Sequence, residues 1–220
     1  MEGDVLFGQF ANFSLQDFLL ELLYRLPAIF IAFAFHECAH SFVAYKLGDE
    51  SQRYSGRMTL SPMAHIDLWG LIMIILLGFG WAKPVRVNPR SFKNPRLGMA
   101  LVSFAGPLTN FILAFLGYGL FVLLAVVWRV NNHIILGVVY SIFSLNVFLM
   151  IFNLVPLPPL DGYHIVEGLI KVKPKWMYTI EQYSSYILMF LLISGLGSQI
   201  AAIGVNYIMP IITNFYNLFL

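Results

Sequence analysis

Two histidines and a glutamate stand together in the segment His36-Glu37-Cys38-Ala39-His40. Residues four apart lie on one face of a helix, so both imidazoles can reach a single metal ion. The carboxylate of Glu37 is then placed to take a proton from a water molecule that the metal activates. The segment lies within an apolar stretch, Leu26–Tyr45, where ionisable side chains are costly and usually functional. The pattern therefore predicts metal-dependent hydrolysis within a membrane.

A catalytic zinc ion usually has three protein ligands and one open position for water, so a third ligand must come from elsewhere. The strongest candidate is Asp161, which follows the proline-rich stretch Asn153-Leu154-Val155-Pro156-Leu157-Pro158-Pro159-Leu160. The prolines end the preceding helix and force the chain into an extended form. Broken backbone at membrane depth is tolerated only inside protein or beside a water-filled cavity. We therefore expect this break to deliver Asp161 to the metal, although Asp is also a favoured helix N-cap.

The two halves of this site are expected to lie at one depth. His36 precedes Lys46 by ten residues, which is about 15 Å along a helix. Asp161 precedes Lys171 by the same number of residues. Because both lysines are expected at the cytoplasmic boundary, the site should lie near the cytoplasmic face.

The composition is that of an integral membrane protein. Of the 220 residues, 59% are hydrophobic and 11% are charged, whereas soluble domains have about 25% charged residues. The net charge of +2 is too small to suggest a nucleic-acid partner. No polar segment is long enough for a separate soluble domain. We expect residues 1–220 to form one membrane domain, with a catalytic core at about 20–170 and a C-terminal helical hairpin at about 176–220.

Hydropathy predicts an all-α polytopic membrane protein with about five to six transmembrane helices. The short run 68–82 contains three glycines, so we expect it to re-enter the membrane and lead into a partly extended hairpin at 80–89. Eleven of the 13 Lys and Arg residues then share one side, which favours five crossings, an exoplasmic amino terminus and a cytoplasmic carboxyl terminus. The spanning runs are Phe18–Leu47, Leu97–Val130, Ile134–Val155 and Trp176–Leu220, the last divided at Ser194–Ser198.

Taken together, these pieces resemble the site-2 protease family of intramembrane zinc metalloproteases, in a short form without an accessory domain. The resemblance rests on the HExxH helix, on the stretch from Asn153 to Gly162, and on Phe104–Asn110, which lies between them. The order and spacing of the three pieces also match. They organise roughly residues 20 to 170.

The resemblance implies a zinc endopeptidase that cuts transmembrane segments of other membrane proteins within the lipid bilayer, as in regulated intramembrane proteolysis. It implies a bacterial or archaeal cell membrane. A substrate helix must be unwound before its carbonyls can be attacked, and residues Val85 to Val87 could pair with the opened strand by edge addition. The implied roles are zinc ligands for His36, His40 and Asp161, general base for Glu37, and a hold on the substrate backbone or its oxyanion for Asn153.

Several alternatives stay open. His65 and Asn110 could also contact the substrate or the oxyanion, but a helix boundary and close helix packing explain them as well. Asn153 could simply bond a neighbouring helix. In a different class of membrane-bound HExxH protease, Glu167 or Glu181 would be the third ligand.

A non-catalytic metal-binding membrane protein or transporter is the remaining alternative. A transporter should carry further ionisable residues along a path through several helices, and the spanning runs hold almost none. His164, three residues after Asp161, is a spare ligand. The sequence does not identify the substrate or the oligomeric state.

Overall fold

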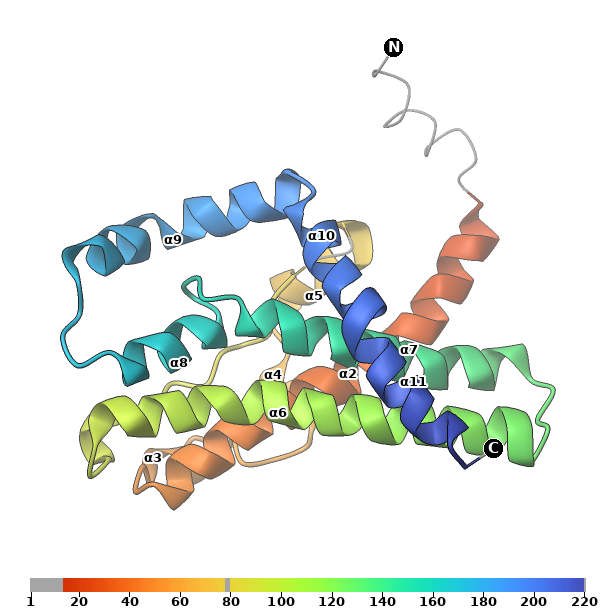
Figure 1. The fold of residues 1–220 in the computed structure, drawn as a ribbon, viewed down its shortest axis with the longest axis horizontal. Coiled ribbons are helices and arrows are strands. Elements are labelled where there is room, and N and C mark those ends of the chain that lie inside the picture. Colours follow the sequence, from red (N-terminus) through yellow and green to blue (C-terminus); the bar gives the residue numbers. More distant parts are fainter. Residues whose placement is uncertain (1–13, 78–79, 220) are drawn as a thin grey trace, which may run out of the picture.

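The computed structural model describes residues 14–77 and 80–219, and these are helical with no β-strand (Figure 1). One isolated antiparallel bridge joins Ile66 to Ala82. The elements are α2 (Leu15–Lys46), α3 (Ser51–Tyr54), α4 (Pro62–His65), α5 (Leu68–Leu77), η1 (Pro89–Ser91), α6 (Pro95–Val122), η2 (Leu123–Val127), α7 (His133–Leu154), α8 (Asp161–Leu169), α9 (Lys175–Ile193), α10 (Leu196–Ile203), η3 (Gly204–Ile208) and α11 (Met209–Asn217).

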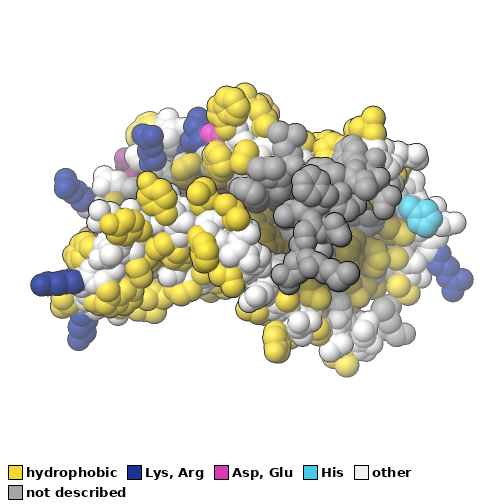
Figure 2. All heavy atoms as spheres, turned by 90° about the horizontal axis from the view of Figure 1, so that it is seen from above, with side chains coloured by type: hydrophobic (Ala, Val, Ile, Leu, Met, Phe, Trp, Pro, Cys, Tyr) yellow, Lys and Arg dark blue, Asp and Glu magenta, His cyan; other side chains and the backbone are white. Residues whose placement is uncertain are grey.

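The described residues contain four helical stretches that are long and apolar enough to cross a membrane. They are Phe18–Lys46, Pro95–Val127, His133–Leu154 and Leu196–Asn217. On the face drawn in Figure 2, hydrophobic side chains cover most of the described surface, and most of the Lys and Arg side chains lie at one end. This distribution fits a lipid-facing surface with one basic end.

Helices α2, α6 and α7 pack against one another and form the centre of the molecule (Figure 1). Ala28 and Ala32 of α2 are fully buried, and such small residues let helix backbones approach closely. Between α6 and α7 the core consists of Ala114, Phe143 and Val147, which are also covered by Ile212 of α11. The site described below lies where these three helices meet.

The segment 66–82, which follows α4, starts and ends at positions that are neighbours in space. Ile66 pairs with Ala82, and the Lys83 backbone N–H donates to the His65 carbonyl over 2.7 Å. Helix α5 has only 10 residues, which is about half the length needed to cross a bilayer. The chain therefore turns back on itself, which confirms the expected re-entrant segment.

The carboxyl-terminal part differs from the expectation. The break at residues 194–198 is present, with Gly195 at φ 78°, but α9 is not among the four stretches that could span, because the first half of this helix is polar. Gly204 packs against Val147, and the Tyr216 hydroxyl donates to the Phe115 carbonyl over 3.0 Å. The last helices therefore cross α7 obliquely and reach α6 on the way to the end of the molecule where α6 and α7 connect (Figure 1).

The carboxyl-terminal helices also bear on the number of crossings. By length and hydropathy, four stretches of the described residues could cross a membrane, so the expected number of about five to six is only approximate. The expected sides of the two chain termini stay a prediction.

Candidate metal centre

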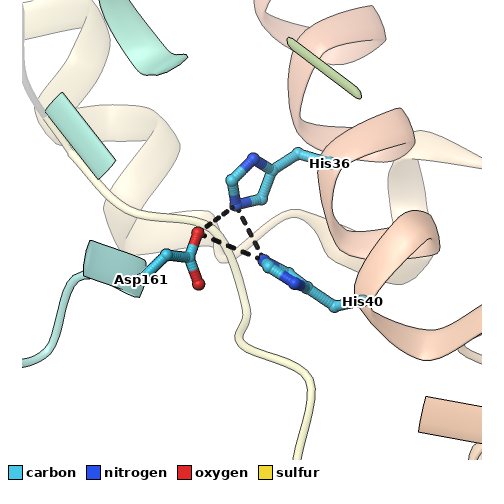
Figure 3. Close-up of side chains that lie close together, drawn as sticks. All are labelled: His36, His40 and Asp161. Carbon is cyan, nitrogen blue, oxygen red and sulfur yellow. Dashed lines mark hydrogen bonds and ion pairs between the residues drawn. The ribbon is translucent and has the colours of Figure 1, made fainter. Parts of the chain in front are cut away.

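Helix α2 presents His36 and His40 on one face, as the four-residue spacing predicts, and both side chains are buried. Their Nε2 atoms lie 2.9 Å apart. The Oδ2 atom of Asp161 lies 3.2 Å from the His36 Nε2 and 3.4 Å from the His40 Nε2 (Figure 3). The three side chains point toward one another from α2 and from the start of α8.

Asp161 reaches this position because α7 ends at Leu154 and α8 begins at Asp161 after a bent, proline-rich connection. Gly162 makes the fold-back possible. A Cβ atom at Gly162 would lie 2.2 Å from the Leu154 carbonyl oxygen, far inside contact distance. The N-cap of α8 is Leu160, so Asp161 does not act as the cap that the sequence left open.

Two hydrogen bonds fix which imidazole nitrogens face Asp161. The His40 Nδ1 lies 2.7 Å from the Val102 carbonyl oxygen, which can only accept, so this nitrogen carries the proton. The His36 Nδ1 lies 3.2 Å from the Oδ1 of Asn110, a fully buried residue of α6. With both Nδ1 atoms donating, each ring turns its Nε2 atom toward Asp161, and a neutral ring offers the lone pair of that atom to a metal ion.

With both imidazoles neutral, as metal binding requires, the group consists of three acceptor atoms with no donor among them. Oδ2 of Asp161 is buried and has no hydrogen-bond partner. Such a set is stable only around a cation, and imidazole with carboxylate suits zinc. Ligand atoms around tetrahedral zinc lie roughly 3.3 Å apart, given Zn–N and Zn–O distances near 2.1 Å. The observed separations of 2.9 to 3.4 Å fit this geometry. Among the described residues, no other group of His, Cys, Asp and Glu is assembled in this way.

Gly106 of α6 forms the wall behind the imidazoles. A Cβ atom there would lie 2.5 Å from the His36 Cε1 and 2.6 Å from the His40 Nε2. Only glycine allows the two rings to lie against the backbone of α6 at this position. Gly106, Val102 and Asn110 therefore make α6 the support for both histidines.

Glu37 lies next to the group without belonging to it. Its Oε2 accepts the backbone N–H of Val85 over 3.2 Å. The carboxylate is only partly buried, in contrast to the neighbouring histidines. Glu37 is thus a partly buried carboxylate that a backbone donor holds and that stands outside the assembled group.

The structure shows which groups the other candidate residues bond. The Asn153 Nδ2 donates to the Leu149 carbonyl one turn back, which places this side chain on the last turn of α7, just before the break. His65 is buried, and its Nε2 donates to the Thr59 carbonyl over 2.7 Å. Asn110 contacts His36 rather than an open substrate position.

The alternative third ligands are engaged elsewhere. Lys173 Nζ lies 2.6 Å from Glu167 and 2.5 Å from Glu181. His164 faces Glu167 over 3.3 Å. Burial by itself raises the pKa of Glu167, but hydrogen bonds from Lys173 and His164 outweigh it and hold the pKa below its usual value. Glu167 is therefore ionised and paired with the Lys173 ammonium group, and it is not a spare ligand for zinc.

Two backbone groups that hydrogen-bond His40 and Glu37 could not be predicted from residue types. Val102 acts through its backbone carbonyl, and Val85 acts through its backbone N–H. An apolar side chain gives no signal of either role. For Asn110 and Gly106 the spacing along α6 was visible, but helix packing explained it equally well.

The helices and this centre together define a membrane-embedded metal-dependent hydrolase. Residues 24–128 and 125–195 match the model of peptidase family M50. The chain belongs to this family, the site-2 proteases, and it is an integral membrane zinc metalloprotease. This membership sets aside the transporter alternative.

Relatives from bacteria and an archaeon are similar over most of the chain. YwhC of Bacillus subtilis, which carries the name of a zinc metalloprotease, is 44% identical over 80% of this chain and 83% of its own length. MJ0611 of Methanocaldococcus jannaschii, similarly named, is 28% identical over 72% of this chain and 74% of its own. Rip2 of Mycolicibacterium smegmatis is 29% identical over 60% of this chain and 51% of its own. No solved structure matches the chain.

Proposed function

We propose that this protein cleaves peptide bonds in transmembrane segments of other membrane proteins, with zinc held by His36, His40 and Asp161. The observation that carries the proposal is a buried set of three acceptor atoms between helices long enough to cross a membrane. We further propose that residues 1–220 act as one domain, in which about 20–170 form the catalytic core and about 176–220 complete it.

The chemistry divides between the metal and the side chains. Bound zinc would lower the pKa of a water molecule in its open position and polarise the substrate carbonyl. Glu37 accepts the proton as the new bond to the carbonyl carbon forms, and it then donates a proton to the departing amine. Asn110 and the Val102 carbonyl keep the imidazoles oriented throughout.

The substrate must present an unwound segment to this site. The Val85 and Val87 side chains are partly buried while Arg86 is exposed, which is the alternation of an extended strand. An opened substrate strand could therefore add to residues 85–87 on the edge that faces Glu37, through the Val85 carbonyl and the Val87 backbone, because the Val85 N–H is bonded to Glu37 and the opposite edge to Gln52. Asn153, on the turn that precedes Asp161, would hold the substrate backbone or its oxyanion through its side-chain amide.

The orientation follows from the basic residues. Lys46 at the end of α2 and the run from Lys83 to Arg96 before α6 lie on the side where both re-entrant ends emerge. Positive charge favours the cytoplasmic side of a cell membrane. The catalytic centre would then open toward the cytoplasmic leaflet.

The ligand set is tested by comparing zinc content in two variants. Asp161→Ala should lower the zinc affinity of the purified protein by at least about 100-fold, because one of three protein ligands is removed. Glu167→Ala should keep the wild-type affinity, since Glu167 is bound to Lys173. Metal analysis after dialysis against a chelator measures both. Zinc lost from Glu167→Ala and kept by Asp161→Ala would reject the ligand set.

The activity itself is tested with purified protein in lipid vesicles and labelled single-span substrates. We expect a new amino terminus within the substrate's hydrophobic segment, mapped by mass spectrometry. Cleavage restricted to the soluble flanks would contradict the proposal. Complete resistance of all single-span substrates, at full zinc occupancy, would also contradict it.

A further inference from the structure

Three of the buried polar side chains that stand outside the metal centre lie along one segment of the chain. Asp49 and Gln52 are each 1% exposed, and His65 is 0% exposed. All three flank one extended stretch, residues 82–88, which we name the strap. Buried polar groups cost stability unless they are hydrogen-bonded, so their partners show what they hold.

One end of the strap is held by Asp49 and Gln52, in the turn that follows α2. The Asn88 backbone N–H donates to the Asp49 Oδ2 over 2.8 Å. The Gln52 Nε2 donates to the Arg86 carbonyl over 2.7 Å and to the same Asp49 oxygen over 2.9 Å. The Gln52 amide and the Asp49 carboxylate thus hydrogen-bond the backbone of the strap at two alternate residues, Arg86 and Asn88.

Asp49 is ionised in this arrangement. Burial alone would raise the pKa of Asp49, but hydrogen bonds from the Asn88 backbone, the Ser51 hydroxyl and the Gln52 amide outweigh it, and the pKa lies below its usual value. Hydrogen bonds to a charged acceptor are stronger than neutral ones. The hydrogen bond from the Asn88 backbone N–H to Asp49 is therefore a charge-assisted one at neutral pH.

The other end of the strap is held at the re-entrant segment. The Lys83 backbone N–H donates to the His65 carbonyl over 2.7 Å, and the Arg57 guanidinium donates to the carbonyls of Ala64 and Lys83. His65 is itself fixed by its bond to Thr59. Both ends of the strap are thus tied to α3, α4 and the segments around them.

The middle of the strap contacts the catalytic machinery at Val85. Alternate residues of an extended chain turn their backbone N–H and C=O groups to opposite edges. Arg86 and Asn88 use one edge for Gln52 and Asp49, so Val85 turns its N–H the other way, toward the Glu37 Oε2 at 3.2 Å. A shift of the strap by one residue would remove this donor from Glu37.

We propose that Asp49 and Gln52 are positioning residues for Glu37, which they hold through the strap and the Val85 N–H. This inference rests on the proposed role of Glu37 as general base. A glutamate side chain has three rotatable bonds, and a fixed backbone donor restricts it to the orientation that serves proton transfer. Within the described residues, the side-chain hydrogen bonds of Asp49 and Gln52 go to the strap, to Ser51 and to each other, and none goes to Glu37 itself.

The test is Gln52→Leu, which keeps the approximate volume and removes every hydrogen bond that the Gln52 amide donates, including those to Arg86 and Asp49. We expect kcat to fall roughly 10- to 100-fold, because small misplacements of a catalytic group have effects of this size, with zinc content and the spectrum of the cobalt-substituted protein unchanged. Gln199→Leu, the same change at an exposed position of α10, should keep the wild-type kcat. An unchanged kcat in Gln52→Leu would overturn the proposal.

A double-mutant cycle separates positioning from general damage. Val85→Pro removes the N–H that reaches Glu37, and Val85→Ala keeps it. If Gln52 acts through Val85, the double variant Gln52→Leu with Val85→Pro should be no slower than Val85→Pro alone. Fully additive losses would show that Gln52 acts by another route and would overturn the proposal.

Amide hydrogen exchange tests the strap without any cleavage assay. The Val85 amide should exchange faster in Gln52→Leu and in Glu37→Ala than in the wild type, while the amides of the α6–α7 core stay protected. An unchanged Val85 amide in Gln52→Leu would overturn the inference even if cleavage is seen. Failure of the wild type to cleave, with faster Val85 exchange in Gln52→Leu, would instead reject the proposed function and still support the link from Gln52 through the strap to Val85.

Discussion

Replacing Glu37 by glutamine should abolish cleavage while zinc stays bound. A carboxamide cannot take up the proton that hydrolysis releases, and general-base catalysis contributes about 10²- to 10⁴-fold. Glutamine keeps an oxygen that can accept the Val85 N–H, so the strap should remain in place. The rate of product formation from a labelled single-span substrate, together with the zinc content of the same sample, measures both expectations.

The matched control is His36→Ala, which should lose zinc and activity together, because His36 Nε2 belongs to the assembled group. Equal product from wild type and Glu37→Gln would exclude Glu37 as the base. Loss of zinc from Glu37→Gln would mean that Glu37 is a ligand, in conflict with its position outside the group.

Replacing Gly106 by alanine should lower zinc affinity by about 10- to 100-fold or more, the range seen when groups that orient metal ligands are lost. The added methyl group would lie 2.5 Å from His36 and 2.6 Å from His40, and neither ring can simply move aside. The His40 Nδ1 is bonded to Val102, and the His36 Nδ1 to Asn110, both on the same helix as Gly106. Chelator competition with the purified protein measures the loss.

Gly197→Ala is the control for this substitution. A Cβ atom at Gly197 would meet nothing within 4 Å, and alanine is a better helix former than glycine. This variant should bind zinc like the wild type and be at least as stable. Wild-type zinc affinity in Gly106→Ala would show that the two imidazoles do not depend on close contact with α6.

The fold was predictable where a local signal decides it. The apolar runs predicted helices α2, α6 and α7, and the glycines of the short run 68–82 predicted the re-entrant segment. The path of the carboxyl-terminal helices was not predictable, because hydropathy gives the number of apolar residues but not the direction in which a helix runs. Contacts such as Gly204 with Val147 and Tyr216 with Phe115 decide that direction.

The sequence by itself determined that His36 and His40 share one helix face, because the helical period fixes it, and that the chain breaks before Asp161, because proline cannot continue a helix. Only the tertiary structure decided that Asp161 meets the histidines while Glu167 pairs with Lys173. It alone also showed the Val102 carbonyl and the Val85 N–H as partners of His40 and Glu37. The physical reason is that every residue type carries the same backbone donor and acceptor, so their use depends on packing and leaves no mark on the side chains.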